Sequence, residues 1–158
     1  LPLLRSLRLY GKICLVSELL LSINAPRLQE LVIAPATVED LRILSSKTKE
    51  LQRSFFPSLR TLVLAPLHFH RHVAEGVLSM AMLCFPEVEH LVLVNTFAKP
   101  LLYAFTSVGP DEPIPWPNIR TISLRQISRH VENAVAQIIQ FRIAYGGSVP
   151  TINIDPDS

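Results

Sequence analysis

The residues with the clearest chemical potential are three alternating histidines, His68, His70 and His72. Side chains two residues apart in an extended segment point the same way, and imidazole is a common zinc ligand. A zinc site needs a third or fourth ligand, and the nearest further candidates are Glu75 and Cys84. The chain has no second pair of ligands at metal-binding spacing. We therefore expect no metal, and a metal-dependent enzyme using His68, His70 and His72 is a remote alternative.

The rest of the sequence gives little support for catalysis. It contains no Gly-x-Ser-x-Gly nucleophile motif, no glycine-rich phosphate loop and no His-Glu-x-x-His zinc motif. The two close acidic pairs do not indicate a catalytic site. Glu39 and Asp40 fit the start of a helix, where carboxylates are favoured, and Asp155 and Asp157 lie in the tail. We predict that the protein is not an enzyme and that it has no cofactor.

The composition is that of one ordinary soluble domain. The 158 residues are 49% hydrophobic and 18% charged, which supplies one core and excludes disorder. Fifteen basic and thirteen acidic residues leave a net charge of +2, so we expect neither nucleic acid nor membrane as a partner. No uncharged apolar run approaches the roughly 18 residues that span a bilayer. Cys14 and Cys84 lie in apolar surroundings, so we expect reduced thiols and a cytoplasmic or nuclear location.

One short pattern, Pro-x-Leu-x-x-Leu-x-Leu, recurs along the whole chain. Its copies begin at Pro2, Pro26, Pro57, Pro86 and Pro117, and a weaker sixth copy consists of Val149, Ile152 and Ile154. The first apolar positions of successive copies are separated by 24, 31, 29, 31 and 30 residues. Recurrence at a nearly fixed period indicates a repeat architecture in which each copy forms one strand.

The intervals between copies have the periodicity of helices. We expect helices at Val16–Ile23, Thr37–Phe55, His72–Cys84, Leu101–Val108 and Ser128–Tyr145. Thr37 fits an N-cap with Asp40 three residues later, Gly146 fits a left-handed C-cap, and the proline-rich segment 109–117 fits a loop. Six strand and helix units in succession predict an α/β solenoid, a horseshoe with a parallel sheet on its concave face and every helix on the other side.

These residues resemble the leucine-rich repeat family. The Leu-x-x-Leu-x-Leu core at about 29-residue spacing extends over nearly the whole chain. The Asn or Cys that the family usually has three positions after the last strand leucine is absent, which indicates an irregular repeat subclass. The proline ahead of each strand and the uneven helix lengths are most similar to the repeats of F-box proteins, particularly the large fungal sets.

The resemblance implies a protein–protein interaction module, the substrate-recognition repeats of an F-box ubiquitin-ligase receptor. In that family a separate N-terminal F-box joins a Skp1-type adaptor. The alternative is a leucine-rich repeat sensor or scaffold of another multidomain protein. We expect residues 1–158 to form a single repeat domain. Because the chain begins inside a repeat and has no polar cap at either end, we expect a fragment of a longer chain whose F-box or other effector domain is missing.

Residues between the inward leucines are expected to point onto the open face of the sheet. Aligning the copies gives three outward rows: Ser6, Glu30, Thr61, His90, Thr121 and Thr151; Arg8, Val32, Val63, Val92, Ser123 and Asn153; and Tyr10, Ala34, Ala65, Val94, Arg125 and Asp155. The middle repeats then present an apolar patch, a common mark of an interface, although β-branched residues also simply fit a parallel strand. The predicted partner-binding residues on this concave face are Tyr10, Glu30, Val32, Val63, His90, Val92 and Val94.

A charged row precedes these three and consists of Arg5, Gln29, Arg60, Glu89 and Arg120. With the strands in register, Glu89 lies between Arg60 and Arg120, and we expect ion pairs across the strands. The alternative is that the arginines bind an acidic or phosphorylated peptide. Trp116 directly precedes a strand proline, and we expect it to pack over the neighbouring repeat.

Overall fold

The structure, a computed structural model, describes residues 1–11, 16–66, 71–94, 103, 105–106, 114–126 and 131–155, with the side chains of 66 and 71–76 left aside. Within these ranges the strands are β1 (Ser6–Tyr10), β2 (Glu30–Ala36), β3 (Thr61–Pro66), β4 (His90–Val94), β5 (Thr121–Arg125) and β6 (Thr151–Asp155). The helices are α1 (Val16–Ser22), α2 (Val38–Leu51), α3 (Arg71–Cys84) and α5 (Val131–Ala144).

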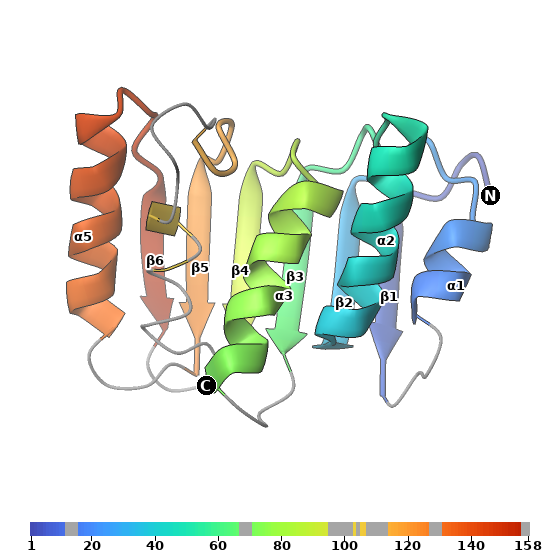
Figure 1. Cartoon of the computed structure of the whole chain (residues 1–158), viewed down its shortest axis with the longest axis horizontal. Helices are drawn as coiled ribbons and strands as arrows, with labels where there is room; N and C mark the ends of the chain where they lie inside the picture. Colours follow the sequence, from blue (N-terminus) through green and yellow to red (C-terminus); the bar gives the residue numbers. More distant parts are fainter. Residues whose placement is uncertain are drawn as a thin grey trace.

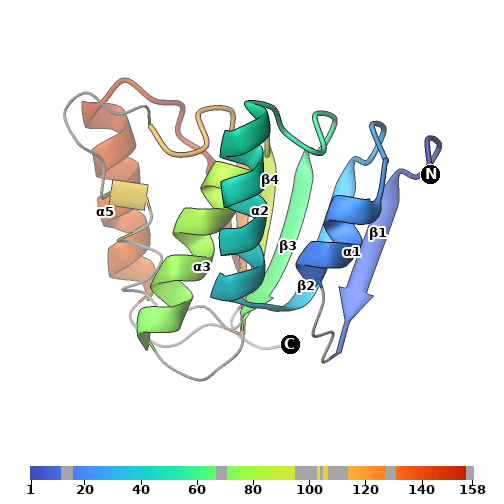
Figure 2. The same ribbon diagram turned by 45° about the vertical axis from the view of Figure 1, so that its right-hand side comes forward.

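The six strands form one parallel sheet in chain order, from β1 at one edge to β6 at the other. The four labelled helices cover the same face of this sheet, so the described residues form two layers (Figures 1 and 2). The predicted α/β architecture with an ordered parallel sheet is confirmed. The sheet is open, since β1 and β6 lie at opposite ends and each has one neighbouring strand.

The described helix boundaries lie within one residue of the predicted ones except at the end of α2, and residues 128–130, at the predicted start of α5, lie outside the described residues. Thr37 is its N-cap, and the Thr37 side chain accepts a hydrogen bond from the backbone N–H of Asp40 as expected. The helix stops at Leu51 rather than at Phe55, because Gln52 adopts a left-handed conformation with φ of 50° and its N–H closes the last turn on Lys49. Gly146 has a φ of 71° just after α5, which confirms the predicted C-cap. The predicted helix Leu101–Val108 lies mostly outside the described residues.

The core lies between the sheet and the helices. The inward residues of β2 to β5 and Leu9 of β1 are at most 7% exposed, and they are Leu9, Leu31, Ile33, Leu62, Leu64, Leu91, Leu93, Ile122 and Leu124. In the two edge strands, Leu7 and Ile152 are half-buried and Ile154 is 39% exposed. From the helices, Leu20, Leu41, Leu44, Val77 and Ile138 complete the same cluster. The leucine spacing in the sequence therefore identified the buried side of the strands.

A tight turn precedes the strands, with the repeated proline at its second position. The backbone N–H of Leu28 donates to Ala25 at 3.1 Å, and the equivalent turns close from Leu59 to Phe56 and from Ile119 to Trp116. Proline presets the φ angle that this turn position requires. The residue before each of these prolines is buried: Ala25, Phe56, Phe85 and Trp116. A side chain thus enters the core ahead of β2, β3, β4 and β5, whereas Leu1 and Val149, which precede the prolines ahead of β1 and β6, are exposed.

Trp116 packs over the neighbouring repeat, as predicted. Its indole N–H donates to the Phe85 carbonyl at 2.9 Å, and its ring lies 5.6 Å from that of Phe105. The φ of Trp116 is 44°, a left-handed conformation that costs about 1–2 kcal/mol for a residue other than glycine. The buried ring and its hydrogen bond hold the backbone in this conformation.

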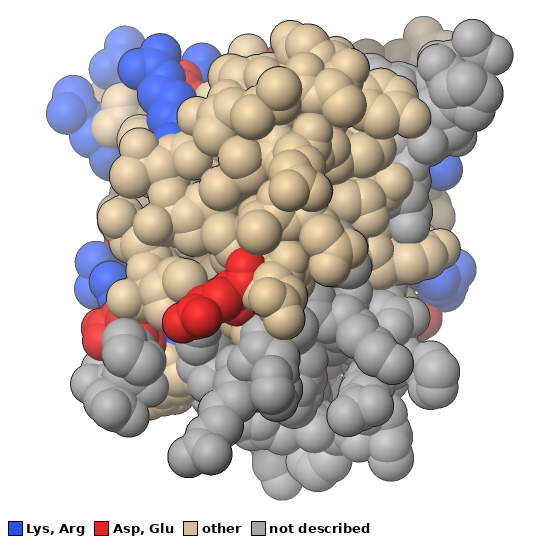
Figure 3. Space-filling model, turned by 90° about the vertical axis from the view of Figure 1, so that its left-hand side faces the viewer, with Lys and Arg blue, Asp and Glu red and all other residues tan. Residues whose placement is uncertain are grey.

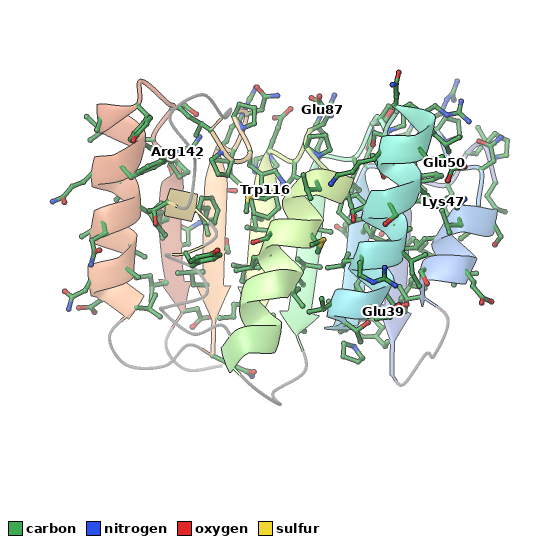
Figure 4. The ribbon with its side chains drawn as sticks, viewed as in Figure 1. Glu39, Lys47, Glu50, Glu87, Trp116 and Arg142 are labelled. Carbon is green, nitrogen blue, oxygen red and sulfur yellow. The ribbon has the colours of Figure 1, made fainter. Side chains whose placement is uncertain are left out.

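Arg142 of α5 fastens the turns that precede β5 and β6. Its side chain is fully buried and donates to three backbone carbonyls, from Nε to Ser148 at 2.6 Å, from Nη1 to Pro115 at 2.8 Å and from Nη2 to Trp116 at 3.3 Å. Figure 4 shows Arg142 and Trp116 at the end of the sheet where the strands begin. Burial lowers the pKa of Arg142, but a guanidinium stays charged in proteins. Among the described residues no carboxylate pairs with Arg142, and the dipoles of the three carbonyls stabilise its charge instead.

Replacing Arg142 by methionine should lower the free energy of unfolding by about 3 kcal/mol, because three backbone carbonyls, of which that of Trp116 is buried and the other two are partly buried, lose a charged donor. Urea denaturation measures the change. Arg53→Met is the control, since Arg53 is exposed and its side chain makes no hydrogen bond within the described ranges. An equal loss in the two variants would contradict the role of Arg142.

Cys84, at the end of α3, is a buried thiol of the core. It is 2% exposed, and its Sγ donates to the Leu41 carbonyl at 3.3 Å. Burial raises the pKa of Cys84 to about 12, which agrees with the predicted reduced core thiol. Cys14 lies outside the described residues.

Because of the buried Cys84 thiol, the free energy of unfolding should vary with pH in the alkaline range. The pKa of Cys84 is higher in the folded chain than the value of about 8.5 for an exposed thiol, so its contribution is complete below pH 8.5. As pH rises from there toward 12, the unfolded chain releases this proton first, and the free energy of unfolding falls by up to about 1.4 kcal/mol per pH unit. Urea titrations across this range should show a steeper fall than in Cys84→Ala. Parallel curves for the two proteins would be the contrary result.

Candidate functional site

The face of the sheet opposite the helices is the candidate site. No described helix lies on this face, which is formed by the six strands side by side (Figures 1 and 2). Because side chains alternate along a strand, the residues between the buried leucines point onto this face. The first row is in register along its whole length, from Ser6 through Glu30, Thr61, His90 and Thr121 to Thr151. The second row, from Arg8 through the three valines to Asn153, is also confirmed.

The third row is broken in the middle. Tyr10 pairs with Ala34, and Val94 pairs with Arg125, which pairs with Asp155. The predicted continuation from Ala34 to Ala65 is wrong, because the register shifts between Ile33 and Ala36. One additional residue lies in β2 at this point, where Pro35 has no N–H to give to the ladder.

The apolar part of the face is less exposed than the sequence suggested. Val32 is buried, at 6% exposed, while Val63, Val92 and Val94 are half-buried. Strands about 4.8 Å apart bring these side chains against one another. The face therefore offers a continuous but shallow apolar strip rather than protruding side chains.

Polar side chains form an ordered network beside the valines. At the β1 end, the Glu30 carboxylate accepts from Ser6 Oγ at 3.0 Å and from Arg8 Nε at 3.1 Å, and it pairs with Arg8 Nη2 at 3.0 Å. On the other side, His90 Nδ1 lies 2.8 Å from Thr121 Oγ1. Tyr10 is well exposed at the edge. The predicted residues Glu30 and His90 thus have partners across the strands.

The charged row at the start of the strands is an ion-pair ladder. Glu89 pairs with Arg60 Nε at 3.2 Å through one carboxylate oxygen and with Arg120 Nε at 3.0 Å through the other. The predicted pairing is confirmed. Arg120 and Glu89 also line a hollow of about 480 Å³ with Asn118, Ser148 and Val149. This hollow lies beside the starts of β5 and β6.

The histidine segment is not tested by the structure. His68 and His70 lie outside the described residues. His72 is the second residue of α3, at the start of the predicted helix His72–Cys84, and its side chain is not described. In the part of the chain that the structure describes, no three His, Cys, Asp or Glu side chains gather in a way that could hold a metal ion.

Two features of this region go beyond what the sequence predicted. The column of buried residues before the prolines, in which Phe56 and Phe85 stack at 6.4 Å, was visible as an apolar residue preceding each repeated proline. The buried Arg142 had no such signal, because its acceptors are backbone carbonyls.

Among the described helices, none has the length and apolar character needed to cross a membrane.

Comparison with protein-family models, with curated proteins and with solved structures finds no match for this chain. The function proposed for it therefore rests on its own repeat pattern and on the geometry of the open face.

Removing the charge of Glu89, the centre of the ion-pair ladder, should have a small effect on the free energy of unfolding. We expect Glu89→Gln to lower the free energy of unfolding by about 0.5–2 kcal/mol, because two partly exposed ion pairs are lost at once. The difference should shrink at high salt, which screens such pairs. Urea denaturation at low and high salt tests this, with Glu132→Gln as control, since Glu132 makes no ion pair among the described residues. A larger loss that is independent of salt would assign Glu89 a different role.

Proposed function

We propose that the chain is a non-catalytic protein-binding module of the leucine-rich repeat solenoid type, which binds a protein partner on the open face of its sheet. The observation that supports this most is the one-sided packing. Helices cover one face of six parallel strands (Figures 1 and 2). The opposite face carries side chains in rows that follow the strand register. A broad regular surface of this kind suits recognition of another chain, whereas catalysis needs a converging set of groups.

The charge of this face indicates the partner's chemistry. Five arginines lie on the strands or directly before them, namely Arg5, Arg8, Arg60, Arg120 and Arg125. Three carboxylates accompany them, from Glu30, Glu89 and Asp155. The face thus carries two more positive than negative charges, which equals the net charge of +2 of the whole chain. The partner surface that complements it is acidic, with apolar side chains that cover Val63, Val92 and Val94.

Within this class, we propose the substrate-recognition repeats of an F-box ubiquitin-ligase receptor, on the basis of the repeat pattern and its prolines. The Skp1-type adaptor would then be joined by an F-box outside these 158 residues. Isolation of the full-length native protein, with identification of its co-purifying chains by mass spectrometry, tests the assignment. A stoichiometric Skp1-type adaptor supports it. Reproducible absence of the adaptor rejects it in favour of a sensor or scaffold with the same binding face.

The binding face itself is tested by Val63→Glu combined with Val92→Glu. Two carboxylates at the centre of the strip should weaken capture of the co-purifying partner at least about tenfold, which is 1.4 kcal/mol or more, because they place charge against the partner's apolar and acidic groups. Calorimetric titration with the purified partner measures the effect. Leu83→Glu is the matched control, since Leu83 is a partly exposed apolar residue of α3 on the helix side.

Folding must be preserved for this comparison. Both glutamates point outward, so the far-ultraviolet circular dichroism of the double variant should equal that of the parent chain. Leu62→Ala, an inward residue of the same strand, behaves differently and should lose about 2–5 kcal/mol of stability. Undiminished partner binding by a folded double variant would exclude the open face as the site.

A further inference from the structure

Arginines are concentrated at the edge of the molecule where β1, β2 and β3 begin and α2 ends. Arg5 and Arg60 directly precede β1 and β3, Arg27 lies in the turn before β2, and Arg53 follows α2. We call these four residues the arginine rim. Seen from the α5 side, Lys and Arg side chains gather where the edge at which the strands begin meets the open face (Figure 3).

Two arginines of the rim have no acidic partner among the described residues. Arg27 and Arg53 are exposed, and neither makes a hydrogen bond or ion pair within the described part of the chain. The acidic residues nearest to them in the sequence, Glu30 and Glu50, are each paired with another basic side chain. The rim therefore carries positive charge that a partner can neutralise.

The ion-pair ladder shows which group fits between arginines of this row. Glu89 lies between Arg60 and Arg120 and gives one carboxylate oxygen to each, at 3.2 and 3.0 Å. Gln29 has the equivalent place two repeats earlier: its N–H donates to the Arg5 carbonyl at 2.8 Å, and its carbonyl accepts from the Arg60 N–H at 3.0 Å. The side chain of Gln29 is exposed and uncharged. The row thus has a neutral amide at a position where the ladder uses a carboxylate.

From these observations we infer that the arginine rim binds an acidic segment of the protein partner. Carboxylates of this segment lie beside Gln29, between Arg5 and Arg60, and pair with Arg27 and Arg53. This inference rests on the proposed function, and it adds the chemical class of the segment that crosses the start of the strands.

The spacing of the arginines favours a run of Asp and Glu over a single phosphate. Adjacent strands lie about 4.8 Å apart, so Arg5, Arg60 and Arg120, which precede every second strand, are about 10 Å from one another along the edge. A single phosphate is bound by donors that converge on one group. An extended segment instead presents single charges on one side about 7 Å apart, which suits a row of separated guanidinium groups.

A substitution at Gln29 tests the inference without removing an arginine. Gln29→Glu places the chain's own carboxylate in the row, so the full-length protein should bind a peptide of alternating Glu and Ser at least about tenfold more weakly than the parent. Fluorescence anisotropy of the labelled peptide at low salt measures this. Gln137→Glu adds the same charge at an exposed position of α5 and should bind like the parent. Equal binding by the two variants would overturn the inference.

Stability and a second probe distinguish the binding role from damage to the fold. Urea denaturation should show Gln29→Glu to be at least as stable as the parent, because its carboxylate lies between two arginines as that of Glu89 does. Arg27→Gln combined with Arg53→Gln should also weaken peptide binding. A peptide of the same length and similar net charge, carried by adjacent phosphoserines, should bind more weakly than the Glu peptide. Tighter binding of the phosphoserine peptide, or no binding of the Glu peptide by the parent, would reject an acidic segment as the occupant.

The purified partner separates this inference from the proposed function. A partner that is lost by Val63→Glu with Val92→Glu but kept by Gln29→Glu would overturn the acidic segment alone. A partner that is lost by Gln29→Glu but kept by the double valine variant would support the arginine rim and reject the valines of the open face. Loss in both variants, with Gln137→Glu unaffected, is the expected result.

Discussion

The structure depends on one backbone contact, repeated at the start of the strands. The carbonyl of Arg5 accepts two N–H groups from the next repeat, those of Gln29 and Glu30, at 2.8 and 3.0 Å. Gln29, Arg60 and Glu89 repeat the same double contact toward β3, β4 and β5. Toward β6, Arg120 receives the N–H of Thr151, because Pro150 has no N–H. This contact fixes where each strand begins relative to the last, and a shift of one residue would turn the buried leucines outward.

The register explains why so much of the fold could be predicted from the sequence. Leucine spacing identified the inward side, and the proline turns identified the first residue of each strand, so two of the three outward rows followed by alignment. The alignment missed the break in the third row, although Pro35 is a signal for it, because a proline inside a strand is confined to edges and bulges. The end of α2 at Gln52 was hidden for a similar reason, because glutamine is no usual signal for a left-handed C-cap. The three carbonyl contacts of Arg142 depend on turns that only the folded chain brings together.

The same register determines which side chains of the open face lie beside one another. Cross-strand neighbours such as Arg60, Glu89 and Arg120 pair because each lies at the same position of its repeat. Several polar groups of the face are therefore already engaged, as with Glu30 beside Arg8. The proposed partner would exchange or extend existing interactions, and exposed arginines such as Arg120 have further donors with which carboxylates could pair. The face is better suited to orienting a charged surface than to a deep pocket for a small ligand.

The shallow apolar strip limits what any single residue can contribute to binding. Apolar area removed from water stabilises by about 25 cal/mol per Å², and half-buried valines such as Val63 and Val92 have only part of their area left to cover. Affinity on this face must therefore be assembled from several repeats at once. Recognition then requires that the strands keep a common register over the breadth of the sheet. The backbone contact that determines the fold is for this reason also the constraint on which a binding function depends.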